Sequence, residues 1–331
     1  MTKRRSTLIV CEKPDQFRAL EPFWKEAYPQ DDISVFYTPP IGSFDFDIPR
    51  DLPISSVPMI ADLKLKPRKR PAQEDGTPSI FDRDFEAMAA GADHIVCATD
   101  CDPQGARNFL DLVNHYNTPF ALSEMSWTSV IFRTAEEYRN VIKRDMRADS
   151  PFLTKAAGVG WAKQYFDYLY LINALPVFGQ ALRAVGYAED YTFLSKFSLQ
   201  TLFTIQRRKD GPFGQSAILM MMKGNHSSSR ESPIGTPISM GNIFFQLRDA
   251  GLIEQINDDG AFKALYQLSD RAHRLLSLMH KDCFDPGLAA RLQDWGETWP
   301  ASKPQIERYI RTFFGKQKRF QGKSLSKIGC L

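Results

Sequence analysis

The stretch Ile95-Val-Cys-Ala-Thr-Asp-Cys-Asp-Pro-Gln-Gly-Ala-Arg107 decides the fold of the first part of the chain. Its apolar run from Ile95 to Ala98 predicts a buried strand, which is followed by Asp100, Asp102 and a glycine turn. Two carboxylates spaced one residue apart at the end of a strand can point into one site. Because Mg2+ takes oxygen ligands, the pair is a candidate magnesium site.

A second stretch, Leu8-Ile-Val-Cys-Glu-Lys-Pro14, has the same design, a short apolar strand that ends in an acid. In open α/β sheets, sites form outside the carboxyl ends of the strands, so the two strand ends are expected to converge. We therefore predict a metal-binding cluster of Glu12, Asp100 and Asp102. Lys13 lies beside this cluster, and Glu12 and Lys13 are the candidate catalytic residues.

Helical and extended patterns alternate around these two strands. The predicted strands are 7–11, 33–38 and 94–99, and the predicted helices are 15–27, 80–90 and 106–116. This alternation predicts an α/β domain over residues 1–150, with a mainly parallel sheet and flanking helices.

These residues together resemble the Toprim domain of type IA DNA topoisomerases. That family opens with a strand ending in Glu-Lys-Pro, and its second signature reads approximately Ala-Thr-Asp-x-Asp-Arg-Glu-Gly-Glu. Residues 98–102 and Gly105 match the signature, whereas Gln104 and Ala106 replace its two glutamates. An isolated pair of aspartates is equally typical of a solvated turn or a helix cap, and the upstream Glu-Lys-Pro favours the Toprim interpretation. The resemblance implies Mg2+ as a cofactor and DNA as a partner. Because Gln104 and Ala106 replace two acids, weak Mg2+ binding is expected.

Weaker matches to the same family follow in order along the chain. A segment starting at Ala162 resembles the family's Ala-Arg-x-x-x-Asp-Trp-Leu, with Lys163 in place of the arginine. Residues 195–201 resemble Ser-x-Gly-Arg-Val-Gln-Thr, and residues 234–240 resemble Leu-Gly-Thr-Pro-Ala-Thr-Arg. The DNA-binding residues that the resemblance and the local charges imply are Lys163, Ser195, Gln200, Thr201, Arg207, Arg208 and Thr236.

The rest of the chain reads as mostly helical, with a winged-helix-like unit. We predict a helical core-like segment at 151–208, a connection beginning with a helix at 209–233, a winged-helix-like unit at 234–300 and a basic tail at 301–331. Aromatic residues are frequent between Phe152 and Val177, a pattern more typical of a core than of a base-stacking surface.

The family's catalytic tyrosine is missing from its expected place. It belongs to a gate region between the segment that ends at Thr201 and the segment that begins at Ile234, and no tyrosine lies between those residues. The one partial match to the family's Thr-Tyr-Pro-Arg-Thr motif is Tyr309-Ile-Arg-Thr312, which follows the winged-helix-like unit. Tyr309 is either a relocated nucleophile or a chance match on a basic amphipathic helix.

Charge and cysteine content narrow the class of protein. The net charge is +3, but residues 301–331 contain eight Lys or Arg and a single acid, Glu307. Clustered positive charge is typical of proteins that bind polyanions, and equally of a solubilising tail.

The five cysteines include no Cys-x-x-Cys pair, so we expect neither disulfides nor structural zinc. No apolar run is long enough to span a membrane, and the N-terminus does not resemble a signal peptide, so a cytoplasmic location is expected.

The leading hypothesis is a protein resembling a truncated type IA topoisomerase that binds single-stranded DNA without relaxing it. Plasmid maintenance, conjugation or phage DNA processing would be fitting contexts. One alternative is a Toprim metal-dependent nuclease or nicking enzyme, in which water attacks the phosphate. Another is a scaffold that has lost nucleic-acid binding, although the basic segment argues against it.

Overall fold

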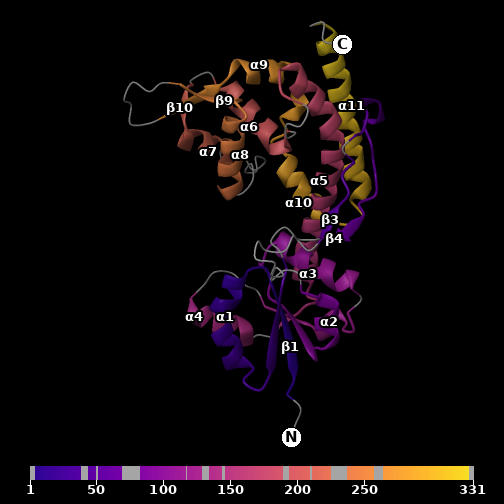
Figure 1. Cartoon of the computed structure of the whole chain (residues 1–331), viewed down its shortest axis with the longest axis vertical. Coiled ribbons are helices and arrows are strands. Elements are labelled where there is room, and N and C mark those ends of the chain that lie inside the picture. Colours follow the sequence, from indigo (N-terminus) through magenta and orange to yellow (C-terminus); the bar gives the residue numbers. More distant parts are fainter. Residues whose placement is uncertain are drawn as a thin grey trace. The chain divides into compact units, whose positions relative to one another are not determined.

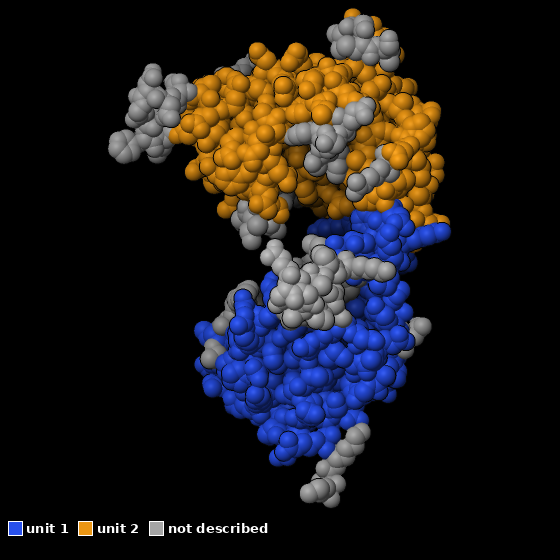
Figure 2. Space-filling view, in the orientation of Figure 1, with its two compact units in different colours: residues 1–47, 63–164, 296–301 blue, residues 48–62, 165–295, 302–331 orange. Residues whose placement is uncertain are grey.

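The computed structural model describes residues 4–38, 44–49, 51–68, 83–116, 118–128, 134–143, 146–188, 194–208, 211–224, 237–256 and 264–327. Its contacts divide the chain into two compact units, drawn in blue and orange in Figure 2. Unit 1 contains residues 1–47, 63–164 and 296–301, and unit 2 contains residues 48–62, 165–295 and 302–331.

Unit 1 is built on a sheet of five strands in the order β2-β1-β5-β6-β7. The strands are β1 (Ser6–Cys11), β2 (Asp32–Tyr37), β5 (His94–Cys97), β6 (Ser126–Trp127) and β7 (Met146–Arg147). The first four strands in this order are mutually parallel, and β7 pairs antiparallel with β6. The mainly parallel sheet predicted from the alternating pattern is therefore confirmed.

Helices cover both faces of this sheet, as Figure 1 shows. They are α1 (Pro14–Ala27) and α4 (Ala135–Lys143) on one face and α2 (Phe85–Ala90) and α3 (Pro103–His115) on the other. A small separate pair, β3 (Phe44–Phe46) and β4 (Leu65–Pro67), is antiparallel. Helix α2 begins at Phe85, later than the predicted 80–90, because the Asp84 carboxylate accepts a hydrogen bond from the Ala87 amide and caps the helix there.

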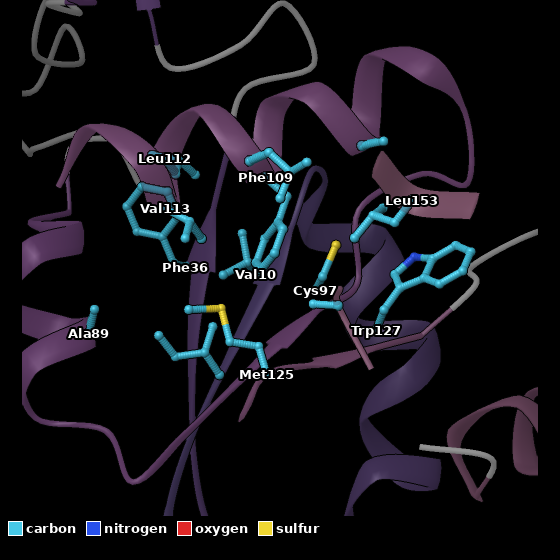
Figure 3. Packing of buried hydrophobic residues seen from close by; sticks show 14 of the residues in the cluster. Val10, Phe36, Ala89, Cys97, Phe109, Leu112, Val113, Met125, Trp127 and Leu153 are labelled. Carbon is cyan, nitrogen blue, oxygen red and sulfur yellow. The ribbon is translucent and has the colours of Figure 1, made fainter. Parts of the chain in front are cut away.

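Alternate residues of the central strands enter two different cores. Leu8 and Val10 pack with Phe109 on the α3 side, whereas Ile9 and Cys11 pack with helix α1 on the opposite side. Figure 3 shows Phe109 directed from α3 onto Val10 of the sheet. Successive side chains of a strand that is covered on both faces enter the two cores in turn, which explains why β1 is apolar without a break from Leu8 to Cys11.

Unit 2 is mainly helical. Its helices include the second half of α5 (Pro151–Ala184), α6 (Lys196–Arg207), α7 (Gln215–Lys223), α8 (Pro237–Asp249), α9 (Asp270–Ser277), α10 (Leu288–Glu297) and α11 (Lys303–Lys327). Short 3-10 helices occur at η1 (Ile54–Ser56) and η3 (Lys281–Cys283), and η2 (Leu122–Glu124) belongs to unit 1. No helix in the described part of the chain has the length and apolar character needed to cross a membrane.

The aromatic residues of α5 form a core, as their pattern predicted. Phe166 and Phe178 are fully buried, and the ring of Tyr170 meets the ring of Phe314 edge-on at 5.2 Å between centroids. Phe314 comes from α11, so the basic segment 301–331 contributes to the core of unit 2. Its apolar residues recur at helical spacing, and their burial anchors the helix.

A small antiparallel sheet completes unit 2. Strands β8 (Phe213–Gly214), β10 (Leu265–Leu268) and β9 (Ile253–Ile256) lie in that order. Helix α8 precedes β9 and β10, which pair antiparallel. Residues 257–263, between these two strands in the sequence, lie outside the described residues.

Candidate functional site

The parallel register of β1 and β5 brings the predicted acids to one edge of the sheet. Val10 pairs with Cys97, and the Ala98 amide continues the ladder by donating to the Val10 carbonyl at 2.9 Å. Glu12 and Asp100 follow these positions directly. We call Glu12, Lys13, Asp100 and Asp102 the carboxylate edge.

Asp100 is held by two donors from the start of α1. Lys13 Nζ lies 2.8 Å from Asp100 Oδ2, and Gln16 Nε2 donates to Asp100 Oδ1 at 3.0 Å. Gln16 Oε1 accepts in turn from the amide of Glu12 at 3.2 Å. Both oxygens of Asp100 therefore have a partner within the protein.

The other two acids are also engaged. Asn108 of α3 donates from Nδ2 to Glu12 Oε1 at 3.1 Å, and Glu12 is buried. Asp102 Oδ1 accepts from the Gly105 amide at 2.8 Å and so caps helix α3. The capping role of Asp102, one of the alternatives for an isolated pair of aspartates, is thus observed.

Gly105, the matched glycine of the signature, is required by close packing. A Cβ built at this position would overlap the backbone carbonyl oxygen of Asp100, and backbone atoms cannot move aside as a flexible side chain can. The Gly105 carbonyl accepts from Thr99 Oγ1 at 2.9 Å. The first turn of α3 is therefore pressed against the loop that carries Asp100.

Burial and crowding act on the protonation of Glu12. Loss of solvation, followed by the negative charge of Asp100, raises the pKa of Glu12 to about 8. The Asn108 hydrogen bond opposes this increase. Glu12 thus carries a proton through much of the neutral range, which relieves the repulsion between the two acids.

The carboxylate edge, as it stands, does not fit a resident magnesium ion. Within the described ranges, no group of three or more His, Cys, Asp or Glu is arranged to hold a metal. Lys13 supplies the positive charge next to Asp100, and Asp102 is turned to the helix cap. To bind a cation, Glu12 would have to release Asn108, and Asp100 would have to release Lys13 and Gln16. Mg2+ binding stays a prediction to be measured.

Three of the predicted DNA-binding residues use their polar atoms inside unit 2. Ser195 Oγ accepts from the Ser198 amide at 3.0 Å and caps α6, and Thr201 Oγ1 donates to the Phe197 carbonyl at 2.9 Å. Gln200 Nε2 donates to the Asp285 carbonyl, also at 2.9 Å. These side chains position helix α6.

The remaining predicted DNA-binding residues are at the surface or undescribed. Lys163 is exposed on unit 1, and Arg207 and Arg208 are exposed on unit 2. The Arg207 guanidinium stacks over the Phe284 ring, 3.7 Å from its centroid. Thr236 lies outside the described residues.

Tyr309 lines a cleft of about 400 Å3 in unit 2. Its hydroxyl donates to Asp285 Oδ2 at 2.8 Å, and Asp285 is also paired with Arg291. Burial and the adjacent Asp285 carboxylate raise the pKa of Tyr309 well above its ordinary value. The phenol is therefore held neutral, with its proton committed to Asp285, which disfavours the phenolate that a nucleophile needs.

A second cleft in unit 2, of about 380 Å3, was not predicted from the sequence. We call it the basic cleft, and its lining residues are His280, Lys281, Asp282, Lys316, Arg319, Phe320 and Lys323. Four cations and one carboxylate leave it with a surplus of three positive charges. The available signal was the spacing of residues 316, 319, 320 and 323, which places them on one face of a helix.

Comparison with known proteins adds no relative: no family model matches this chain, and no curated protein matches its sequence.

Proposed function

We propose that this chain is a type IA topoisomerase-like protein that binds single-stranded DNA without strand passage. The observation that carries the proposal is the basic cleft, where cations surround an exposed aromatic ring. Non-specific single-strand binding sites combine these two features, because cations follow the phosphates and aromatic rings stack with bases.

The architecture supports the family part of the proposal. A Toprim interpretation of unit 1 rests on four parallel strands whose carboxyl edge holds Glu12 and Asp100. A winged-helix interpretation of unit 2 rests on α8 followed by the antiparallel pair β9 and β10. Contacts that depend on phosphates would supply most of the affinity, with little preference for sequence.

The proposal is tested by fluorescence anisotropy with a labelled single strand and the duplex of the same sequence. Binding should favour the single strand, weaken steeply with added salt and not require Mg2+. The salt slope should correspond to about 0.7 per phosphate contact. Equal or tighter binding to the duplex, or no binding to either, would refute the proposal.

Supercoil relaxation should be absent, since Tyr309 is a neutral phenol tied to Asp285. Negatively supercoiled plasmid incubated with Mg2+ should keep its linking number in both wild type and Tyr309→Phe. Relaxation by the wild type that the substitution removes would instead identify Tyr309 as a relocated nucleophile.

The nuclease alternative is favoured by one observation, the convergence of Glu12, Asp100 and Asp102. Against it, Lys13 and the α3 cap already occupy Asp100 and Asp102. End-labelled single and double strands incubated with Mg2+ or Mn2+ should stay intact. Cleavage that Asp100→Asn abolishes would make the nuclease the better assignment.

A further inference from the structure

Three of the four cations of the basic cleft are carried by helix α11. Lys316, Arg319, Phe320 and Lys323 follow the spacing i, i+3, i+4, i+7, so their side chains share one face. An adjacent face of the same helix is buried, with Phe313, Phe314 and Gln317 in the core. Packing of α11 therefore fixes which side chains the cleft receives.

The other wall of the cleft is fastened to α11. Buried Gln317 accepts from the His280 amide at 2.7 Å through Oε1 and donates to the Leu278 carbonyl at 3.0 Å through Nε2. This clamp holds the segment that carries His280, Lys281 and Asp282 against the helix. The two walls are therefore preorganised, as expected of a binding site and not of loosely placed surface lysines.

Only one of the four cations is neutralised. Lys316 Nζ lies 2.7 Å from Asp282 Oδ2. Lys281, Arg319 and Lys323 have no ion-pair partner among the residues that the structure describes. Three uncompensated cations around one cleft of about 380 Å3 make a dense positive site, within the size range of small-ligand pockets.

An aromatic ring is available beside these cations. Phe320 is 37% exposed, and the His280 ring meets it edge-on at 5.6 Å between centroids. A planar base could stack on this ring while its phosphate reaches the cations, as in single-strand recognition.

We propose that the basic cleft binds the terminal phosphate monoester of a nucleotide, with its base on Phe320. A phosphodiester within a strand carries one negative charge, whereas a phosphate monoester carries nearly two at neutral pH. The cleft has room for one small ligand and contains three unpaired cations, so the doubly charged monoester complements its charge better than an internal phosphodiester does. The inference deepens the proposed single-strand binding and rests on it where the ligand is a strand end; a free nucleotide presents the same chemistry.

The experiment compares internally labelled single strands of one sequence that carry a 5′-phosphate, a 3′-phosphate or hydroxyls at both ends. Thymidine monophosphate, thymidine and inorganic phosphate serve as competitors. One phosphorylated strand should bind at least about tenfold tighter than the hydroxyl strand, and thymidine monophosphate should compete better than thymidine. Arg319→Gln with Lys323→Gln should remove both differences.

Two further variants separate the contributions. Arg308→Gln with Lys327→Gln removes the same charge from exposed positions of α11 outside the cleft, and should keep the end preference. Phe320→Ala should weaken competition by thymidine monophosphate more than competition by inorganic phosphate, because only the former has a base.

The outcomes distinguish this inference from the proposed function. If all strands bind equally and thymidine monophosphate does not compete, the monoester site is refuted while single-strand binding stands. If thymidine monophosphate binds in a manner that requires Arg319 and Lys323 but no strand binds, the site is confirmed for free nucleotides and the proposed function fails. Absence of both kinds of binding refutes both.

Discussion

All three acids at the carboxylate edge of unit 1 have partners inside the protein, whereas only one of the four Lys and Arg side chains that line the basic cleft of unit 2 has an ion-pair partner among the described residues. Asp100 has Lys13 and Gln16, Glu12 has Asn108, and Asp102 caps a helix. In the basic cleft, Lys316 is the only one of the four Lys and Arg side chains that has an ion-pair partner among the described residues, namely Asp282.

This difference between the two regions indicates which charged cluster is free to bind a ligand. A charge whose partners are all internal stabilises local structure, and an outside ligand must compete with those partners. A ligand that binds an exposed, unpaired charge in a preorganised cleft does not have to displace an internal partner. This reasoning favours the basic cleft as the ligand site, although the acids carry the more specific sequence motif.

The largest expected effect concerns the rigidity of the carboxylate edge. Gly105→Ala should destabilise the protein by more than about 3 kcal/mol, since its Cβ overlaps the Asp100 backbone. Gly322→Ala, in open space within α11, is the matched control and should stabilise by about 0.5–1 kcal/mol. Chemical denaturation measures both, and a tolerated Gly105→Ala would show that the edge is adaptable.

The next effect concerns binding at the basic cleft. Substituting Lys281, Arg319 and Lys323 together by Gln should weaken single-strand binding by about 10- to 100-fold and reduce the salt slope by about 2. The fold should be unaffected, because these side chains are exposed. Anisotropy titrations at several salt concentrations provide the measurement, and an unchanged slope would place the interface elsewhere.

A smaller effect is expected from the proton on Glu12. Its folded pKa, about 8, exceeds the ordinary value of 4.5, so the folded state binds more protons between these limits and stability falls as pH rises through them. Glu12→Gln keeps the Asn108 contact and removes this loss, so it should stabilise by about 1–3 kcal/mol near pH 8 and by little below pH 4.5. Thermal melts across pH would contradict this if the gain were the same at every pH.

The smallest effect tests Lys13 as the internal counter-ion of the carboxylate edge. Wild-type melting should be insensitive to millimolar Mg2+, whereas Lys13→Met should gain about 2–4 °C from it, since Asp100 then lacks its cation. Adding Asp100→Asn to that variant should remove the gain. A Mg2+ shift in wild type that disappears in Asp100→Asn with Asp102→Asn would establish the magnesium site.

The sequence alone determined the sheet and the convergence of its acids. Successive side chains of a strand point to opposite faces, so the unbroken apolar runs of β1 and β5 require burial on both faces. Parallel strands also end at the same edge of a sheet whatever surrounds them. The burial of the aromatic residues of α5 could also be predicted from the sequence, because apolar periodicity is a local property.

Only the tertiary structure decided which polar side chains bond to other parts of the protein and which remain available to bind a ligand. Nothing local indicates that Gln200 serves the Asp285 carbonyl, that Lys13 pairs with Asp100, or that Gln317 fastens the segment at His280 to α11. The partner of a polar or charged side chain depends on which distant segment packs beside it. For that reason the sequence located the acidic motif, and the structure was needed to find the basic cleft.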